Sequence, residues 1–215
     1  MKHQGRLITF IVTAVVLIDQ LIKVVIKTTM NLGEEINILS WFKIHFTENN
    51  GMAFGMEIFG KLFLTSFRVL AVILIIYYLT RIINKGFKTG YIICLSFILA
   101  GALGNIIDCL FYGVLFNESS FITTATFLPE GGGYAPFLYG KVVDMFYFPI
   151  IDTTWPNWVP FIGGESFRFF NAIFNFADAS ISCGIVALVL FYGKTLNHIS
   201  LKGPSSPKET TNTHA

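Results

Sequence analysis

The chain has 215 residues, of which 53% are hydrophobic and 13% are charged, and its formal net charge is +2. Its mean hydropathy is +0.64. Soluble domains carry roughly 25% charged residues, so this chain has too little polar surface to coat a globule in water. No basic stripe interleaved with aromatic residues points to nucleic acid. The composition excludes an ordinary soluble domain and predicts a protein that crosses a membrane several times.

The cysteines and histidines indicate neither a metal site nor a disulfide framework. Cys94, Cys109 and Cys183 lack the spacing of metal ligands and that of secreted disulfide scaffolds, so we expect three buried free thiols. The four histidines do not form the H-E-x-x-H pattern of zinc hydrolases. We therefore expect no metal and no cofactor.

Four segments are long and apolar enough to span a bilayer, which takes about 20 residues per helix. They are residues 7–27, 62–83, 91–112 and 169–192. The connections 28–61 and 113–168 are long, and the sequence predicts one domain over residues 1–193. The Pro-, Ser- and Thr-rich stretch 194–215 is predicted to be a disordered tail. The expected fold is an all-α membrane protein with four transmembrane helices and extended outer loops.

Basic residues set the expected orientation. Lys and Arg gather before the first span, between the second and third, and after the fourth, so these regions are predicted to be cytoplasmic. Both termini then lie inside. Residues 1–27 are not expected to be a cleaved signal peptide, because Asp19 and Lys23 interrupt the apolar run and no small-x-small site follows.

Polar side chains interrupt three of the spans. Such residues are expensive in a bilayer, so they usually face a protein interior and mark a functional site. Asp19 and Lys23 are four residues apart on one helix face, which favours a structural charge pair. Asn105 and Asp108 share a face of the third span. At about 1.5 Å per residue, Asp178 is expected on the order of 13 Å below the outer end of its helix.

Asp144 and Asp178 are the candidate catalytic pair. Each is surrounded by apolar residues, and two carboxylates that meet at low dielectric share a proton. The charged member then takes a proton from water while the neutral one donates to the leaving group, which permits amide hydrolysis without a metal. Alternatively, the two carboxylates form a proton or cation pathway, or pair separately with basic residues (Arg68, Arg168 or Lys141).

Other functional classes stay open on the residues alone. A proton- or ion-coupled carrier would use the same buried carboxylates, although four spans without an internal repeat make this less favourable. A membrane scaffold would need them only to join helices. The run Asn49-Asn50-Gly51 is equally typical of a turn and of an asparagine that holds a substrate backbone.

Five segments, in order, resemble the signal peptidase II family, the lipoprotein signal peptidases. They are Asp19-Gln20-x-x-Lys23, Asn49-x-Gly51-x-Ala53-Phe54, Gly101-x-x-Gly104-Asn105-x-x-Asp108, Val142-Val143-Asp144 and Phe174-Asn175-x-Ala177-Asp178. The segments fall on the expected four-helix topology and cover most of residues 7–192. Each motif is weak alone, but five in order are highly specific.

The resemblance implies an intramembrane aspartyl endopeptidase of the bacterial inner membrane, active near the outer face. Its substrates would be diacylglyceryl-modified prolipoproteins, cut by water just before the lipidated cysteine. Asp144 and Asp178 match the catalytic aspartates. Residues that match positions lining or supporting the site are Asn49, Gly51, Gly101, Asn105, Asp108, Asn175 and Ala177. The resemblance also implies inhibition by globomycin-type cyclic peptides, contact with membrane lipid and a monomeric state.

Two departures from the family pattern carry expectations of their own. Cys109 stands where the family usually has arginine, so Asp108 is expected to pair with Arg68 or Arg168. The stretches 110–141 and 152–166 are enlarged and are expected outside the membrane, as a lid or a partner surface.

Residues 28–61 are expected to form a β-rich cradle at the membrane interface, through the aromatic side chains of Trp41, Phe42, Phe46, Phe54 and Phe59.

Overall fold

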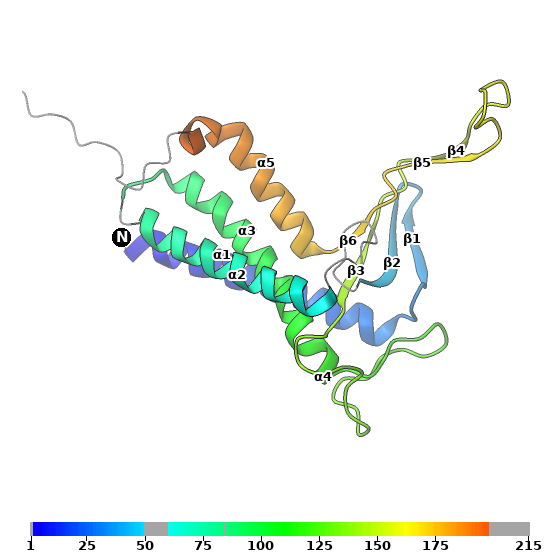
Figure 1. The fold of residues 1–215 in the computed structure, drawn as a ribbon, viewed down its shortest axis with the longest axis horizontal. Helices are drawn as coiled ribbons and strands as arrows, with labels where there is room; N and C mark the ends of the chain where they lie inside the picture. Colours follow the sequence, from blue (N-terminus) through cyan, green and yellow to red (C-terminus); the bar gives the residue numbers. More distant parts are fainter. Residues whose placement is uncertain (1, 50–59, 84, 198–215) are drawn as a thin grey trace, which may run out of the picture.

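The computed structural model describes residues 2–49, 60–83 and 85–197. Its long helices are α1 (Lys2–Thr29), α2 (Gly60–Ile83), α3 (Thr89–Ile107) and α5 (Phe176–Asn197). The α3 helix lies in the middle, in contact with α1, α2 and α5 (Figure 1). A π-helical turn, η1 (Asp108–Tyr112), and the short α4 (Gly113–Leu115) prolong it.

Length and composition allow four described helices to cross a membrane. They are His3–Thr29, Gly60–Ile83, Thr89–Leu115 and Phe176–Gly193. The first three agree with the predicted spans to within a few residues at each end. The four spans of the sequence prediction are thus present as helices.

Small residues allow α3 and α5 to pack closely. A Cβ atom added at Gly101 would lie 2.2 Å from the Ala177 backbone oxygen and 2.7 Å from Ile181 Cγ1. One added at Gly184 would lie 2.8 Å from the backbone oxygen of Cys94. Helices in lipid associate through such backbone approaches, because burial of apolar surface provides no driving force there.

A four-stranded antiparallel sheet lies at the end of the bundle where α5 begins (Figure 1). Its order is β1 (Glu35–Leu39), β2 (Phe42–Asn49), β3 (Val142–Tyr147) and β6 (Ile173–Phe174). We call the face of the sheet that carries Val143 and Met145 its rear face. These two side chains pack with Phe46 in an apolar core that also includes side chains of α1, η1 and the connection 113–141.

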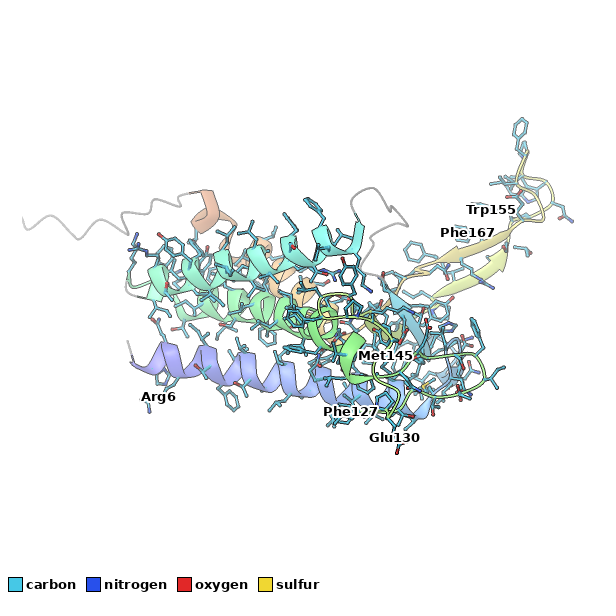
Figure 2. The ribbon with its side chains drawn as sticks, turned by 60° about the horizontal axis from the view of Figure 1, so that its bottom comes forward. Arg6, Phe127, Glu130, Met145, Trp155 and Phe167 are labelled. Carbon is cyan, nitrogen blue, oxygen red and sulfur yellow. The ribbon has the colours of Figure 1, made fainter. Side chains whose placement is uncertain are left out.

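A second hairpin projects from the body (Figure 1). It consists of β4 (Ile151–Thr154) and β5 (Ser166–Phe169). Trp155 and Phe167 pack on each other there with ring centroids 4.9 Å apart. Figure 2 places both rings at the far end of the molecule from Arg6, which lies near the start of α1. The stretch 152–166, which was expected to be enlarged, therefore forms a projecting hairpin.

Four sequence predictions need correction. The fold is not all-α, since it includes two sheets. The fourth helix begins at Phe176 rather than at residue 169, because Ile173 and Phe174 pair with β3 and Asn175 caps the helix. Asp178 therefore lies in the first turn of α5, not about 13 Å down the helix. Cys94 and Cys109 are buried as expected, whereas Cys183 is exposed.

We predict that Gly101→Ala destabilises the bundle by about 1–3 kcal/mol, the usual range for overpacking, because the Ala177 backbone cannot move freely. Gly193→Ala is the matched control, since a Cβ atom there has nothing within 4 Å. Unfolding of the detergent-solubilised protein measures both. Equal stability of the two variants would contradict the close α3–α5 contact.

Candidate active site

One face of α1 carries a buried charge pair. Lys23 Nζ lies 2.9 Å from Asp19 Oδ2, and neither side chain is exposed. Asp19 Oδ1 accepts the Ala177 backbone N–H at 2.9 Å, which fixes the start of α5. The predicted structural pairing of Asp19 with Lys23 is therefore seen in the geometry, and it also joins two helices.

Asp108 lies in the π-helical turn and is fully buried. Its Oδ2 is 2.8 Å from Lys23 Nζ and accepts the Val143 backbone N–H at 3.3 Å. The expected pairing with Arg68 or Arg168 is wrong, because the lysine of α1 already neutralises this carboxylate. Arg68 instead donates to Cys109 Sγ at 3.2 Å.

Two asparagine side chains connect the two candidate aspartates. Asn175 Nδ2 donates to Asp144 Oδ1 at 2.6 Å and to Asn105 Oδ1 at 3.1 Å. Asn105 Nδ2 donates in turn to Asp178 Oδ1 at 2.7 Å. Lys23 Nζ also donates to Asn105 Oδ1, at 2.9 Å, which fixes the orientation of that amide. The structure thus brings Asp144 and Asp178 into one network, although 34 residues separate them in sequence.

Asn175 also sets the position of Asp178 directly. Its side-chain oxygen accepts the Asp178 backbone N–H at 2.9 Å, as an N-cap does. The carboxylate of Asp178 lies in the first turn of α5, where negative charge is favoured, and it accepts the Asn175 backbone N–H at 3.4 Å. Asp178 remains partly accessible, whereas Asp144 is 3% exposed.

Strand β3 presents Asp144 on the face of the sheet opposite its apolar core. Val143 and Met145 belong to that core, and successive side chains of a strand alternate between faces. Burial and, next, the nearby charge of Asp178 raise the pKa of Asp144, the hydrogen bond from Asn175 lowers it, and the resulting pKa is about 7. Asp144 is therefore protonated in a large fraction of molecules at neutral pH.

The remaining predicted residues surround this network, with one exception. Asn105, Asn175 and Ala177 are buried in it, and Gly101 packs on Ala177. Asn49 ends β2 opposite Val142, two residues before Asp144 on the neighbouring strand. Gly51 lies outside the described residues.

Two residues of the network, Gln20 and Tyr112, and one buried lysine outside it, Lys27, were not predicted. Gln20 Nε2 donates to Asp108 Oδ1 at 2.9 Å, and Tyr112 donates its hydroxyl to Gln20 Oε1 at 3.1 Å. Lys27 is fully buried and pairs with Glu48 of β2. Lys27 follows Lys23 by four residues, so the helical period of charges on α1 was the signal that could have found it.

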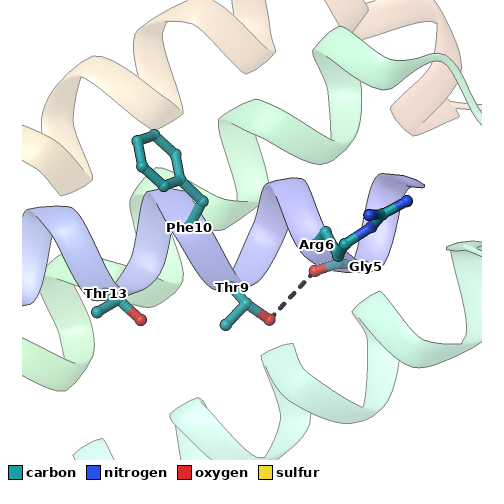
Figure 3. Close-up of a pocket in the computed structure, with 5 residues that line it drawn as sticks. All are labelled: Gly5, Arg6, Thr9, Phe10 and Thr13. Atoms are coloured by element: carbon teal, nitrogen blue, oxygen red, sulfur yellow. Dashed lines mark hydrogen bonds between the residues drawn. The ribbon is translucent and has the colours of Figure 1, made fainter. Parts of the chain in front are cut away.

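The described residues include no group of three or more His, Cys, Asp or Glu side chains that could hold a metal ion. A groove of about 850 Å³ lies on α1, lined by Gly5, Arg6, Thr9, Phe10 and Thr13 (Figure 3). It has no carboxylate or carboxamide, and it lies in the half of α1 far from Asp19. The groove therefore offers no acid–base group of the kind found in the aspartate network.

Comparison with known proteins agrees with this arrangement. A family model of signal peptidase (SPase) II matches residues 11–193. A lipoprotein signal peptidase of Porphyromonas gingivalis is 45% identical over 209 residues, which cover 97% of this chain and 92% of that protein. The lipoprotein signal peptidase of Amoebophilus asiaticus is 32% identical, over 81% of this chain and 72% of that protein.

A solved structure of a membrane enzyme is similar to this chain in fold. A bacterial membrane enzyme determined by the in meso method has a TM-score of 0.56 and 25% identity, with 94% of each chain covered. The helices, the sheet and the aspartate network thus occur in a chain whose sequence relatives are lipoprotein signal peptidases. This chain belongs to the signal peptidase II family.

Proposed function

We propose that this protein is an intramembrane aspartyl endopeptidase that removes signal peptides from diacylglyceryl-modified prolipoproteins. It cuts just before the lipidated cysteine. The observation that carries the proposal is the amide bridge, in which Asn175 and Asn105 hold the carboxylates of Asp144 and Asp178 in one buried network. The carrier alternative has no comparable support, because the family of this chain consists of peptidases.

The two aspartates have different environments and therefore different roles. Asp144 is buried with a raised pKa of about 7, so it holds the proton and donates it to the leaving nitrogen. Asp178 is more accessible and lies at a helix N-terminus, so we assign it as the base that activates water. Environments that separate two carboxylates in this way are typical of acid–base pairs.

The proposed placement in the bilayer follows from the basic residues and the sheet. Both termini are cytoplasmic, and the aspartates lie near the outer face, where a lipid-tethered scissile bond arrives. The sheet forms an extracytoplasmic cradle. Its front face is rich in aromatic rings: Phe42 stacks on Phe148 at 4.8 Å, and Phe148 on Phe174 at 5.6 Å. Trp41, 53% exposed, borders it and suits the membrane interface.

Further parts of the proposal concern organisation and ligands. Residues 1–193 form the peptidase domain and 194–215 a cytoplasmic tail, and the enzyme acts as a monomer. Membrane lipid surrounds the site. Globomycin-type cyclic peptides inhibit the enzyme by occupying the substrate position beside Asp144 and Asp178. Asn49 supports the substrate from the end of β2, and Gly51 is proposed to share this supporting role.

We predict that Asp144→Asn and Asp178→Asn each lower the cleavage rate of a diacylglyceryl-modified prolipoprotein by about 10²- to 10⁴-fold. Asparagine keeps the size and polarity of the side chain but cannot exchange the proton. A gel-shift assay with purified protein measures this. As a control, Cys183→Ala cuts normally, because this cysteine is exposed and no cysteine acts as nucleophile. Normal cleavage by either folded asparagine variant would disprove the mechanism.

We also predict that kcat declines as the pH rises through about 7. The pKa of Asp144 is raised, so its carboxyl is protonated below about pH 7 and loses the proton above it. The general acid is therefore present on the acidic side and lost on the alkaline side. A pH–rate profile measures this decline in kcat, with a detergent-solubilised substrate that is stable over the pH range. A rate that increases through this range would reverse the roles of the two aspartates.

A further inference from the structure

A second buried charge cluster lies behind the sheet, outside the aspartate network. Lys27 Nζ pairs with Glu48 Oε1 and donates to Ser119 Oγ at 2.8 Å. Ser119 Oγ in turn donates to the same Glu48 oxygen at 2.8 Å. Lys141 Nζ lies 3.5 Å from the other oxygen of Glu48. The side chains of Lys27 and Glu48 are 0% and 3% exposed, so this is an interior site, not a surface ion pair.

The enlarged connection 113–141 encloses this cluster. The Tyr134 ring lies between the two lysines, with Lys27 Nζ at 5.1 Å and Lys141 Nζ at 5.3 Å from its centroid. The Ala125 backbone N–H donates to the Lys27 backbone oxygen at 3.2 Å. The insertion therefore does more than cover the outer end of α1: it supplies the hydroxyl, the ring and the second lysine around Glu48.

The cluster is connected to Asp144 through the strand register. Glu48 is paired with Val143, the residue immediately before Asp144, and cross-strand partners share one face of a sheet. Val143 is also held from η1, since its backbone N–H donates to Asp108 Oδ2. Contacts that hold β3 on its rear face also fix the Asp144 side chain on the front face. A shift of one residue in the pairing of β3 with β2 would move every side chain of β3 to the opposite face.

These contacts complete a series of charges on α1. Asp19, Lys23 and Lys27 follow one another at intervals of four residues, and each fixes a different element: α5 through Ala177, η1 through Asp108, and β2 through Glu48. Asp19 orients the start of the helix that carries Asp178. The two lysines orient the strand pair that carries Asp144, from Asp108 and from Glu48.

We infer that Glu48, held by Lys27, Ser119 and Lys141, is a positioning residue for Asp144, and that the insertion 113–141 is the buttress that completes this support. Glu48 acts from behind the sheet and does not touch substrate. The inference rests on the proposed function, in which the position of Asp144 determines the rate of the chemical step.

The test uses the full chain with Glu48→Gln and two readouts. A displacement of about 1 Å in a catalytic group costs up to about 10²-fold in rate, so we expect kcat to decrease about tenfold or more while KM is unchanged. Hydrogen exchange of the β3 amides, residues 142–147, is expected to accelerate. The matched control is Glu35→Gln, which removes a carboxylate from an exposed pair with Lys43 on the same sheet. We expect it to alter neither readout.

The outcomes separate positioning from general stability. A Glu48→Gln protein with a lowered unfolding temperature but unchanged kcat and β3 exchange would overturn the inference. If that variant does not fold, Ser119→Ala decides: it keeps both charges, and we expect a two- to fivefold lower kcat with faster β3 exchange. Wild-type values for both readouts in Ser119→Ala would also overturn it. If wild-type protein does not cut prolipoprotein, the proposed function fails. Hydrogen exchange of the β3 amides then tests by itself whether Glu48 positions β3.

Discussion

The neutralisation of Lys23 is the interaction on which the rest of the structure depends. A lysine with no exposed surface must have opposite charges in contact, since an unpaired buried ammonium would be prohibitively costly. Asp19 and Asp108 provide them from two different helices. Because each of these carboxylates also accepts a backbone N–H, from Ala177 and from Val143, the charge cluster determines where α5 and β3 begin.

The same cluster lies beside the aspartate pair. Lys23 is the single cation that hydrogen-bonds within the described network of Asp19, Asp108, Asn105 and the two candidate aspartates. Four carboxylates thus share one buried lysine. Burial, followed by the nearby charge of Asp178, raises the pKa of Asp144 to about 7, although the hydrogen bond from Asn175 and the charge of Lys23 lower it. A carboxyl group that keeps its proton near neutral pH is suited to act as a general acid.

The two faces of the sheet have different parts in the site: one face carries the supporting contacts and the other carries Asp144. Its rear face carries the apolar core and the Glu48 cluster, while its front face carries Asp144 and the aromatic rings that continue from it. The connection 113–141 packs behind the strands and also against η1, where the Gly140 backbone N–H donates to the Cys109 backbone oxygen at 2.9 Å. The β4–β5 hairpin projects away from both faces.

The sequence by itself determined the four spans, the polar residues inside them and the catalytic candidates, because apolar length and buried charge are local properties of the chain. It misplaced the start of α5, because the apolar residues 169–174 are equally suited to a helix and to strands. Only the tertiary structure showed that Asp108 pairs with Lys23 rather than with an arginine, and that Lys27 forms a buried ion pair with Glu48. Those pairings join residues far apart in the chain, and spacing along one sequence contains no information on which distant charges meet.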